Sequence, residues 1–478
     1  MDHRNHAGSL GVLVGYAPLW AHLSVYAVTC LIAAIFFYSG HRPALALVEY
    51  FSGAIVPTEY SLRQAAVLWA LLLGAPALLS LGFVAAMRIR LEGVSSLLRR
   101  LVGSSDKEIP VWIPFLLFAA AAGVGAHDLT RAGAFARLGA WSDYGAWVEG
   151  RWMLFATLGY FSFVNLYLIL PVSTTWLILA IPGRGWKVLV MRLLPLAIVV
   201  ALTLFLFQKK ALIVSLILIF GAVLLHRVLA GAWTRRLTWL LITTAGLLAM
   251  VYFVLVVLPI YSETSRTANE ALVEQSGSND ARHKPCEKTG TPEKTRQVCR
   301  EVVSYIGTER SAHVMSYVLL APMTRTSLPA MYYPIVFPEH HDYYGLDFGQ
   351  DILGFGGMPD DNIVIWKHMY PDLPGGSAGA PYQFALYSQV GVIWTLLLCV
   401  TVGLALGVMW QAVLTDGISR IWRSLMGAVL VLYGIYLAID SIRGGLLASY
   451  GLIWAWAFII ISFLIGRLLG SRQQFKPA

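Results

Sequence analysis

The chain has 478 residues, of which 58% are hydrophobic and only 13% are charged. A soluble protein carries roughly a quarter charged residues, so this composition excludes an ordinary soluble domain. The formal net charge of +9 lies largely in short loops beside apolar runs, where the positive-inside bias of membrane proteins explains it better than nucleic-acid binding does. The composition therefore predicts an all-α polytopic integral membrane protein.

Transmembrane helices are predicted wherever an apolar run reaches about 18 residues. About ten such runs follow one another along the chain. The longest, Trp152–Pro182, fits one tilted helix, a helix broken at Pro171, or two short segments. In chain order the predicted spans are Ala21–Tyr38, Gln64–Met87, Pro110–Ala126, Trp152–Pro182, Val188–Phe207, Ala211–Ala230, Trp239–Tyr261, Ala385–Trp410, Ser424–Ala438 and Leu446–Leu469.

The loop after the second span predicts the orientation of the chain. Loops rich in Lys and Arg remain in the cytoplasm, and this loop holds Arg88, Arg90, Arg99, Arg100 and Lys107. If the spans alternate in direction, both termini are cytoplasmic and the turn at Lys209–Lys210 lies outside. The first ten residues lack the basic region and cleavage site of a signal peptide, so we expect no processing.

Three parts divide the chain: an N-terminal transmembrane bundle (1–261), a large outer segment (262–384) and C-terminal transmembrane helices (385–478). An oxidising compartment would let Cys286 and Cys299, both in the outer segment, form a disulfide. Closing this loop of roughly 14 residues is worth about 3 kcal/mol in the chain-entropy model. The alternative is two free thiols. Cys30 and Cys399 lie in apolar spans, as packing residues do.

The outer segment changes character along its length. Residues 262–295 are polar, whereas residues 296–321 have the apolar spacing of an amphipathic helix that Pro322 ends. The part that follows is rich in aromatic residues. Rings with polar tips suit a membrane interface, and they also stack on the C–H faces of sugars. If these rings stack on sugars, the glycan-binding residues are Tyr332, Tyr333, Tyr343 and Tyr344.

Charged and titratable residues of the outer side suggest phosphate chemistry. Guanidinium and ammonium groups bind phosphate, and the outer cations are Lys209, Lys210, Arg310 and Arg325. The alternative is that these side chains only reach ordinary lipid headgroups. Arg310 and His313, which share a helix face, form the best local pair for catalysis. Other candidate bases are His340, His341, Asp347, Asp360 and Asp361.

Motifs for several enzyme classes are missing from the sequence. It contains no glycine-rich phosphate loop, no compact His/Cys cluster with zinc spacing and no serine-hydrolase elbow. A kinase, a metallohydrolase and a serine hydrolase are therefore disfavoured, and we expect no metal or nucleotide cofactor.

Three stretches resemble one family. "QKKALIVSLILI" sets Lys209–Lys210 before an apolar helix, "ERSAHVMSYVLL" resembles a periplasmic Gly-Arg helix, and "APYQFALYSQVGVIWTLLL" leads into a span with Gln389 shortly before Gly391. Together with one large late outer segment, these stretches resemble the bacterial O-antigen (oligosaccharide repeat-unit) polymerases, relatives of the O-antigen ligases. The chain has Lys209–Lys210 where the family has Ser-Arg. It also lacks the ligase-type "HN" signature, of which "DDNIVIWKH" is a faint echo.

The resemblance implies a GT-C-like fold with a large periplasmic loop in the bacterial inner membrane. It implies glycosyl transfer between two undecaprenyl-pyrophosphate-linked oligosaccharides, which builds an O-antigen, capsule or exopolysaccharide. The four outer cations would hold pyrophosphate, and a base among His313, His340 and His341 would activate the acceptor. The expected partners are the lipid-linked oligosaccharide, the lipid bilayer and a chain-length regulator protein, with no nucleic acid.

Other classes of protein remain alternatives. An O-antigen ligase or another GT-C lipid-linked glycosyltransferase would use related chemistry, and the second of these would depend on carboxylates such as Glu49, Glu59 or Asp128. A peptidoglycan-type polymerase has a similar span layout. A transporter ranks lower, because transporters place charges or broken helices near the membrane midplane, whereas most charges here avoid the centres of the predicted spans.

Overall fold

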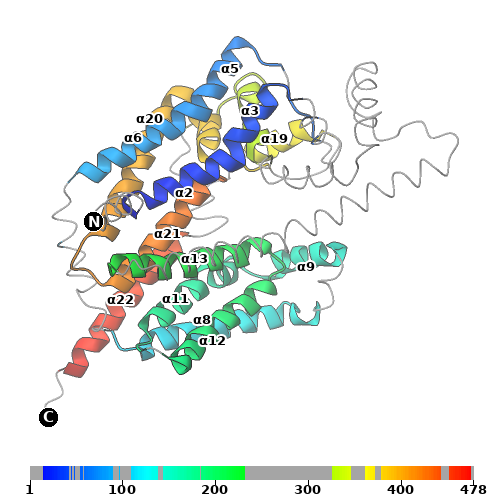
Figure 1. The fold of residues 1–478 in the computed structure, drawn as a ribbon. Coiled ribbons are helices and arrows are strands. Elements are labelled where there is room, and N and C mark those ends of the chain that lie inside the picture. The colour runs from blue at the N-terminus through cyan, green and yellow to red at the C-terminus, as the bar shows by residue number, and fades with distance from the viewer. Residues whose placement is uncertain are drawn as a thin grey trace.

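The computed structural model describes 14–41, 45, 48, 54–57, 59–89, 96, 109–137, 144–183, 185–231, 324, 326–345, 361–371, 378–442 and 452–474. Within these ranges, nine helices are long and apolar enough to cross a membrane, and they pack side by side (Figure 1). This finding confirms the polytopic helical class and nine of the predicted spans. The tenth, Trp239–Tyr261, lies outside the described residues. The nine are Ala17–Tyr38, Leu62–Arg88, Trp112–Arg131, Tyr160–Ala180, Trp186–Leu204, Lys210–Leu229, Tyr382–Leu414, Arg420–Leu437 and Leu452–Leu469.

Six spans contain no π-helical turn, and five of them are regular or nearly regular helices. α12 keeps its helical course through Pro195, and α20 contains an interruption that matters for the site below. The six are α8 (Trp112–Arg131), α12 (Trp186–Leu204), α13 (Lys209–Leu229), α20 (Tyr382–Leu414), α21 (Arg420–Leu437) and α22 (Leu452–Gln474).

A π-helical turn interrupts each of the other three spans. Such turns are rare, and they occur often at functional sites. Carbonyl oxygens inside two of them accept side-chain hydrogen bonds: Leu72 O accepts from Tyr26 Oη at 2.9 Å, and Thr29 O accepts from Thr326 Oγ1 at 2.6 Å. The three spans are α2 (Ala17–Tyr26), η1 (Ala27–Leu31) and α3 (Ile32–Tyr38); α5 (Leu62–Trp69), η2 (Ala70–Gly74) and α6 (Ala75–Arg88); α10 (Tyr160–Val164), η5 (Asn165–Ile169) and α11 (Leu170–Ala180).

The long apolar run Trp152–Pro182 forms two segments, which was one of the three alternatives. α9 (Tyr144–Thr157) ends before Gly159, and the helical course resumes at Tyr160. Pro171 does not break the helix, because it lies in the first turn of α11, directly after the π-helical turn. A proline is tolerated where its missing N–H group would have no intrahelical partner. The division therefore falls about twelve residues before Pro171, the position at which another of the alternatives placed a break.

α6 and α20 pack with their backbones in close approach. A Cβ atom added to Gly403 would lie 2.0 Å from Leu79 O, and one added to Gly82 would lie 2.2 Å from Val400 O. A Cβ atom on Gly407 would meet Ala86 Cβ at 2.7 Å. Small residues at such spacing let membrane helices approach closely enough for van der Waals contact along their length. The glycines of this interface therefore fix how α20 lies in the bundle.

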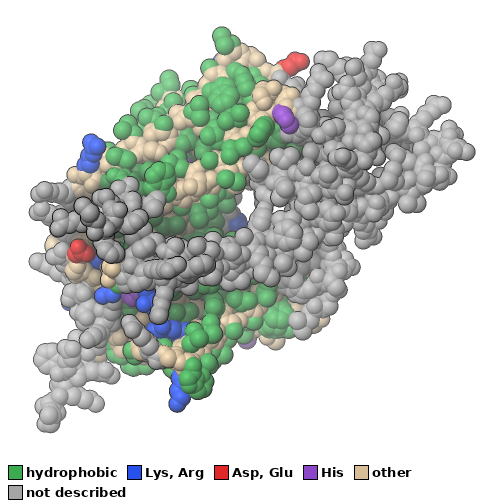
Figure 2. Space-filling view, in the orientation of Figure 1, with side chains coloured by type: hydrophobic (Ala, Val, Ile, Leu, Met, Phe, Trp, Pro, Cys, Tyr) green, Lys and Arg blue, Asp and Glu red, His purple; other side chains and the backbone are tan. Residues whose placement is uncertain are grey.

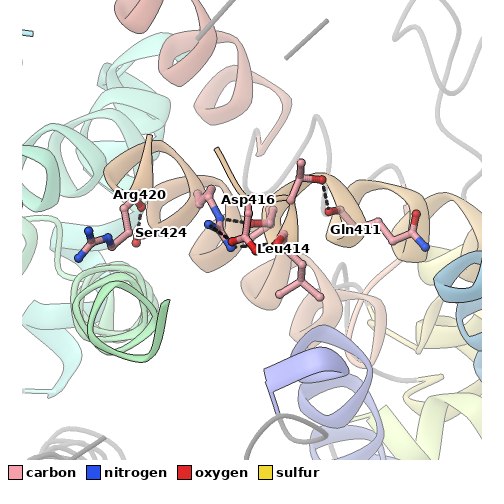
Figure 3. Close-up of polar contacts among 8 residues, drawn as sticks. Gln411, Leu414, Asp416, Arg420 and Ser424 are labelled. Atoms are coloured by element: carbon pink, nitrogen blue, oxygen red, sulfur yellow. Dashed lines mark hydrogen bonds and ion pairs between the residues drawn. The ribbon is translucent and has the colours of Figure 1, made fainter. Parts of the chain in front are cut away.

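The turn between α20 and α21 is held by a buried arginine. Arg423 is 7% exposed, and its guanidinium donates from Nε to Val413 O at 2.6 Å, from Nη2 to Leu414 O at 2.9 Å and from Nη1 to Asp416 Oδ1 at 3.1 Å. Figure 3 shows Leu414 and Asp416 converging on this turn. The last carbonyl groups of a helix have no intrahelical donor, so the guanidinium caps the end of α20.

Two apolar clusters make up the core of the described chain. The larger cluster joins α6, α8, η5, α11, α12, α13, α20, α21 and α22. The second cluster lies at the end of the bundle where α5 begins, and it joins α2, α3, α5 and η2 to parts of the predicted outer segment. The outer surface is largely hydrophobic, as Figure 2 shows for one face, and most of its visible Lys and Arg side chains lie toward the end where α6 finishes. This surface suits a lipid environment.

Candidate functional site

Described parts of the outer segment pack into the second apolar cluster. The helical segment 326–336 and α19 (Asp361–Met369) both contribute buried residues to it. Tyr332 donates from its hydroxyl to Ile55 O at 2.6 Å, and Tyr60 donates to Met331 O at 3.3 Å. These contacts join the residues just before α5 to the segment 326–336. The described part of the outer segment is therefore integrated into the bundle at its α5 end.

α20 is interrupted at Gly391, whose φ is +75°. A break in a helix removes the N–H donors of the next turn from the preceding carbonyl groups. Here backbone N–H groups from another segment replace them: Tyr344 donates to Ser388 O at 3.1 Å, and Gly345 donates to Gln389 O at 2.9 Å. The first part of α20, residues 382–390, thus forms a half-helix that residues 344 and 345 hold at its end.

Asp361 is the central charged group of this region. Asp361 is 8% exposed, and its carboxylate accepts a hydrogen bond from Tyr333 Oη at 2.8 Å. Ser388 Oγ lies 3.2 Å from the carboxylate and 2.8 Å from Ala385 O, and it shares its one proton between these two acceptors. Three elements therefore meet at one carboxylate: the segment 326–336, α19 and the half-helix 382–390. We call Asp361, Tyr333 and Ser388 the Asp361 site.

Burial dominates the electrostatics of the Asp361 site. It raises the pKa of Asp361 to about 6, against the lowering effect of the hydrogen bonds from Tyr333 and Ser388. The nearby charge of Asp440 raises the pKa a little further. Burial also raises the pKa of the Tyr333 phenol, and the charge of Asp361 adds to this rise. A carboxyl group with a pKa near 6 can accept and release a proton close to neutral pH.

A second hydroxyl pair lies beside the Asp361 site. Tyr343 donates from its hydroxyl to Tyr387 Oη at 3.3 Å, and Tyr387 donates to Phe337 O at 2.7 Å. The Tyr343 ring is 36% exposed, and it lies 3.5 Å from the position that a Cβ atom on Gly391 would take. Tyr343 is therefore an accessible aromatic ring at the break in α20.

The two adjacent histidines lie at the end of the segment 326–336. The backbone N–H groups of His340 and His341 both donate to Val336 O, at 2.8 and 3.0 Å. His341 packs on Tyr344 with ring centroids 4.7 Å apart, and the ring of His340, which is exposed, lies 6.0 Å from the ring of His368. His341 therefore packs against Tyr344, whose backbone N–H caps the half-helix.

The aromatic residues assigned to glycan binding divide into two groups. Tyr332 and Tyr333 are 6% and 1% exposed, with their hydroxyls committed to Ile55 O and Asp361. These two rings are part of the packed core. Tyr343 is exposed and Tyr344 is half-buried, so a role in glycan contact stays a prediction for these two.

Two of the four predicted cations, Lys209 and Lys210, lie within the described residues. Lys209 and Lys210 begin α13, on the larger apolar cluster, and the Lys210 side chain is exposed while that of Lys209 is not described. Gln208, just before them, accepts a hydrogen bond from Tyr167. The remaining predicted positions lie outside the described residues: Cys286, Cys299, Arg310, His313, Arg325, Asp347 and Asp360.

Sequence reasoning missed Ser388, Tyr387 and His368. Ser388 and Gln389 are polar residues within an apolar run, and this pattern could have identified Ser388. Across the described residues, no group of three or more His, Cys, Asp and Glu side chains gathers as a metal site. The site therefore offers a carboxylate, hydroxyl groups and aromatic rings as its chemistry.

Fold and site together define the class of the protein as a polytopic helical membrane protein with a buried carboxylate at one end of its bundle. Comparisons with models of protein families, with curated proteins and with solved structures found no match to the chain.

Proposed function

We propose that the chain is a membrane glycosyltransferase that polymerises oligosaccharide repeat units carried on undecaprenyl pyrophosphate. The observation that carries this proposal is the buried carboxylate of Asp361, held by the hydroxyls of Tyr333 and Ser388 at the α5 end of the bundle. Glycosyl transfer without a metal or nucleotide needs a base for the acceptor hydroxyl, and efficient bases have a pKa near the working pH. The resemblance of the chain to repeat-unit polymerases supplies the substrate class.

In this proposal, Asp361 takes the proton of an acceptor sugar hydroxyl as the oxygen attacks the anomeric carbon of the donor. The bond between that carbon and the pyrophosphate oxygen breaks, and the lipid pyrophosphate leaves with the bonding electron pair. Lys209, Lys210, Arg310 and Arg325 would neutralise the leaving pyrophosphate. Arg310, His313, His340 and His341 remain candidates for a direct catalytic part. Asp361 is the base that the described geometry favours.

The proposal also fixes the orientation and the partners. The α5 end faces the periplasm and both termini face the cytoplasm, in the bacterial inner membrane, and residues 262–384 form the periplasmic segment of a GT-C-like enzyme. Tyr343 and Tyr344 lie along the path of the glycan. Because the product is a polymer, a separate chain-length regulator is an expected partner.

A proton-coupled transporter is the second candidate, and two observations favour it. Asp361 is a buried carboxylate with a pKa of about 6, and α20 is interrupted beside it at Gly391. Transporters build their sites from interrupted helices and use buried carboxylates as proton carriers. An O-antigen ligase is the third candidate, since it would use the same acceptor chemistry on a different acceptor.

Deletion of the gene, followed by complementation with variants, separates these functions. The test variant is Asp361→Asn, which keeps the size of the side chain and removes its basicity. The control is Glu149→Gln, which removes an exposed carboxylate that pairs with Arg137 at 3.3 Å. Surface polysaccharide is then resolved by electrophoresis, and protein amounts in the membrane are matched by immunoblot.

The proposal predicts single repeat units with Asp361→Asn and long chains with Glu149→Gln. Complete loss of attached glycan in the deletion strain, with free polymer still made, would instead indicate a ligase. Normal chain lengths with Asp361→Asn would contradict the transferase. Proteoliposomes loaded with a pH-sensitive dye would then show whether the wild-type chain moves protons and whether Asp361→Asn abolishes the movement.

A further inference from the structure

Three fully buried polar side chains lie in the interior of the bundle, on residues that the proposed chemistry does not use. They are His22 on α2 and Tyr382 and Gln383 at the start of the half-helix 382–390, and each is 0% exposed. Polar side chains inside membrane spans are costly, and they usually mark a functional position.

His22 has one satisfied ring nitrogen and one without a partner. Its Nδ1 lies 3.1 Å from Gly434 O, so in the neutral ring Nδ1 carries the proton and Nε2 is an acceptor. Among the described residues, Nε2 has no hydrogen-bond partner. The ring stacks on Tyr26 and meets the edge of Tyr382, each at 5.9 Å between centroids. Nε2 is therefore an acceptor enclosed by the bundle.

Gln383 and Tyr382 present further buried polar atoms. Neither the Gln383 amide nor the Tyr382 hydroxyl makes a hydrogen bond of normal geometry within the described part of the chain. The Cys399 thiol, a weak hydrogen-bonding group, lies beside the Tyr382 hydroxyl. Tyr26 lies near Gln383, but its hydroxyl donates its proton to Leu72 O at 2.9 Å. The Tyr26 oxygen can still accept from the Gln383 amide, so Gln383 keeps its amide oxygen and one N–H for another group.

The helices on one side of these atoms pack closely. A Cβ atom on Gly434 would lie 2.5 Å from Pro18 O, so α2 and α21 are in backbone contact beside His22. Polar atoms left without a good hydrogen bond in a low-dielectric interior raise the free energy of the folded chain. In native proteins, ordered water commonly satisfies atoms of this kind.

The mixture of donors and acceptors identifies the class of ligand. A cation would need acceptors alone and an anion donors alone, whereas His22 Nε2, the Gln383 amide and the Tyr382 hydroxyl offer both kinds. Water donates two hydrogen bonds and accepts two. We infer that His22, Tyr382 and Gln383 form an internal site that holds bound water between α2, α20 and α21.

This hydrated site lies at the start of the half-helix 382–390, inside the bundle. Ser388 and the Asp361 site lie toward the other end of the same half-helix. The half-helix is thus held at both ends by polar groups. The inference does not depend on the proposed transferase, because it rests on the spans alone.

X-ray radiolytic hydroxyl-radical labelling of the full chain in nanodiscs tests the inference, because bound water is the source of radicals at buried positions. His22 and Tyr382 are expected to be modified severalfold faster than Trp176, which is 1% exposed in apolar packing. Trp176 is a strict control, since an indole is intrinsically at least as reactive as a phenol or imidazole. Equal or slower modification of both His22 and Tyr382 would overturn the inference.

Two variants refine the test. Gln383→Leu removes three hydrogen-bonding positions and is expected to lower the labelling of His22 severalfold. Gln64→Leu, which changes an amide bound to Glu339 near the surface, is expected to leave it unchanged. If Gln383→Leu does not fold, Tyr382→Phe removes one hydroxyl and is expected to lower the labelling less. Unchanged labelling of His22 in the variant that folds would contradict the site.

Discussion

Tyr333 donates a hydrogen bond of 2.8 Å to the carboxylate of Asp361, across 28 positions of the chain. Tyr333 belongs to the segment 326–336, and Asp361 is the first residue of α19. A carboxylate at a helix N-terminus is stabilised by the free N–H groups there. The pair therefore joins two short helices from the predicted outer segment, and Ser388 connects both to α20.

Asp361→Asn is expected to change how stability depends on pH. The pKa of Asp361 is about 6 in the folded chain and about 4 in an unfolded chain. Between these values the folded chain binds more protons than the unfolded chain, so the contribution of Asp361 to stability is full below pH 4 and is lost as the pH rises through 6. The loss is on the order of 3 kcal/mol.

Thermal unfolding in detergent measures this difference. The stability of Asp361→Asn relative to wild type should increase from pH 4 to pH 7 and then stay level. Glu149→Gln, which alters an exposed carboxylate, should show no such trend. A constant difference between Asp361→Asn and wild type across this range would mean that Asp361 titrates as an ordinary carboxylate.

Gly391→Ala is expected to destabilise the chain by about 1–3 kcal/mol, because its φ of +75° is unfavourable for any residue with a Cβ atom. The added methyl group would meet the Tyr343 ring at 3.5 Å, which is ordinary contact, so the cost comes from the backbone. Gly123→Ala in α8 has open space and helical φ, and it should be neutral or slightly stabilising. Equal melting temperatures for both variants would refute the strained break.

Gly403→Ala is expected to prevent α6 and α20 from packing. The new Cβ atom would lie 2.0 Å from Leu79 O, and backbone atoms cannot move aside as a flexible side chain can. The cost should reach or exceed the usual range for overpacking, about 1–3 kcal/mol. Gly74→Ala meets only a Leu396 methyl group at 3.6 Å and serves as the control. Size-exclusion profiles and melting curves give the comparison, and a wild-type profile for Gly403→Ala would contradict the packing.

Arg423→Met is expected to destabilise the chain by several kcal/mol, since Val413 O and Leu414 O each lose a donor worth about 1–3 kcal/mol when buried. Asp416→Asn should cost less than about 1 kcal/mol, because the Asp416 side chain is 96% exposed. Arg420→Gln changes an exposed neighbour, whose carbonyl accepts from Ser424 (Figure 3), and it should be neutral. An Asp416→Asn variant as unstable as Arg423→Met would assign the effect to the ion pair instead.

Much of the membrane bundle follows from sequence, because a span needs only an apolar run of sufficient length. Nine spans confirm the predictions within a few residues at most ends. The division at Gly159 and the π-helical turns were not predictable from hydropathy, since they depend on tertiary contacts such as that between Asn165 Nδ2 and Ala121 O at 2.9 Å.

The candidate site was predictable only as a set of residue types. Asp361 was one of several possible bases in the sequence, and Tyr333 was an aromatic residue assigned to glycan binding. Only the fold brings the two together and buries Tyr333 as a hydrogen-bond donor. The break at Gly391, which gives Ser388 its place, required a positive φ that no sequence pattern marks.

The most direct measurement of the central claim is the length distribution of lipid-linked glycan made by membranes of the deletion strain that carry wild type, Asp361→Asn or Asp361→Glu. The account predicts chains of many repeat units with wild type, whose activity should fall as the pH drops below about 6. It predicts single units with Asp361→Asn and partial recovery with Asp361→Glu. Chains of wild-type length from Asp361→Asn, at matched protein amounts, would contradict the account.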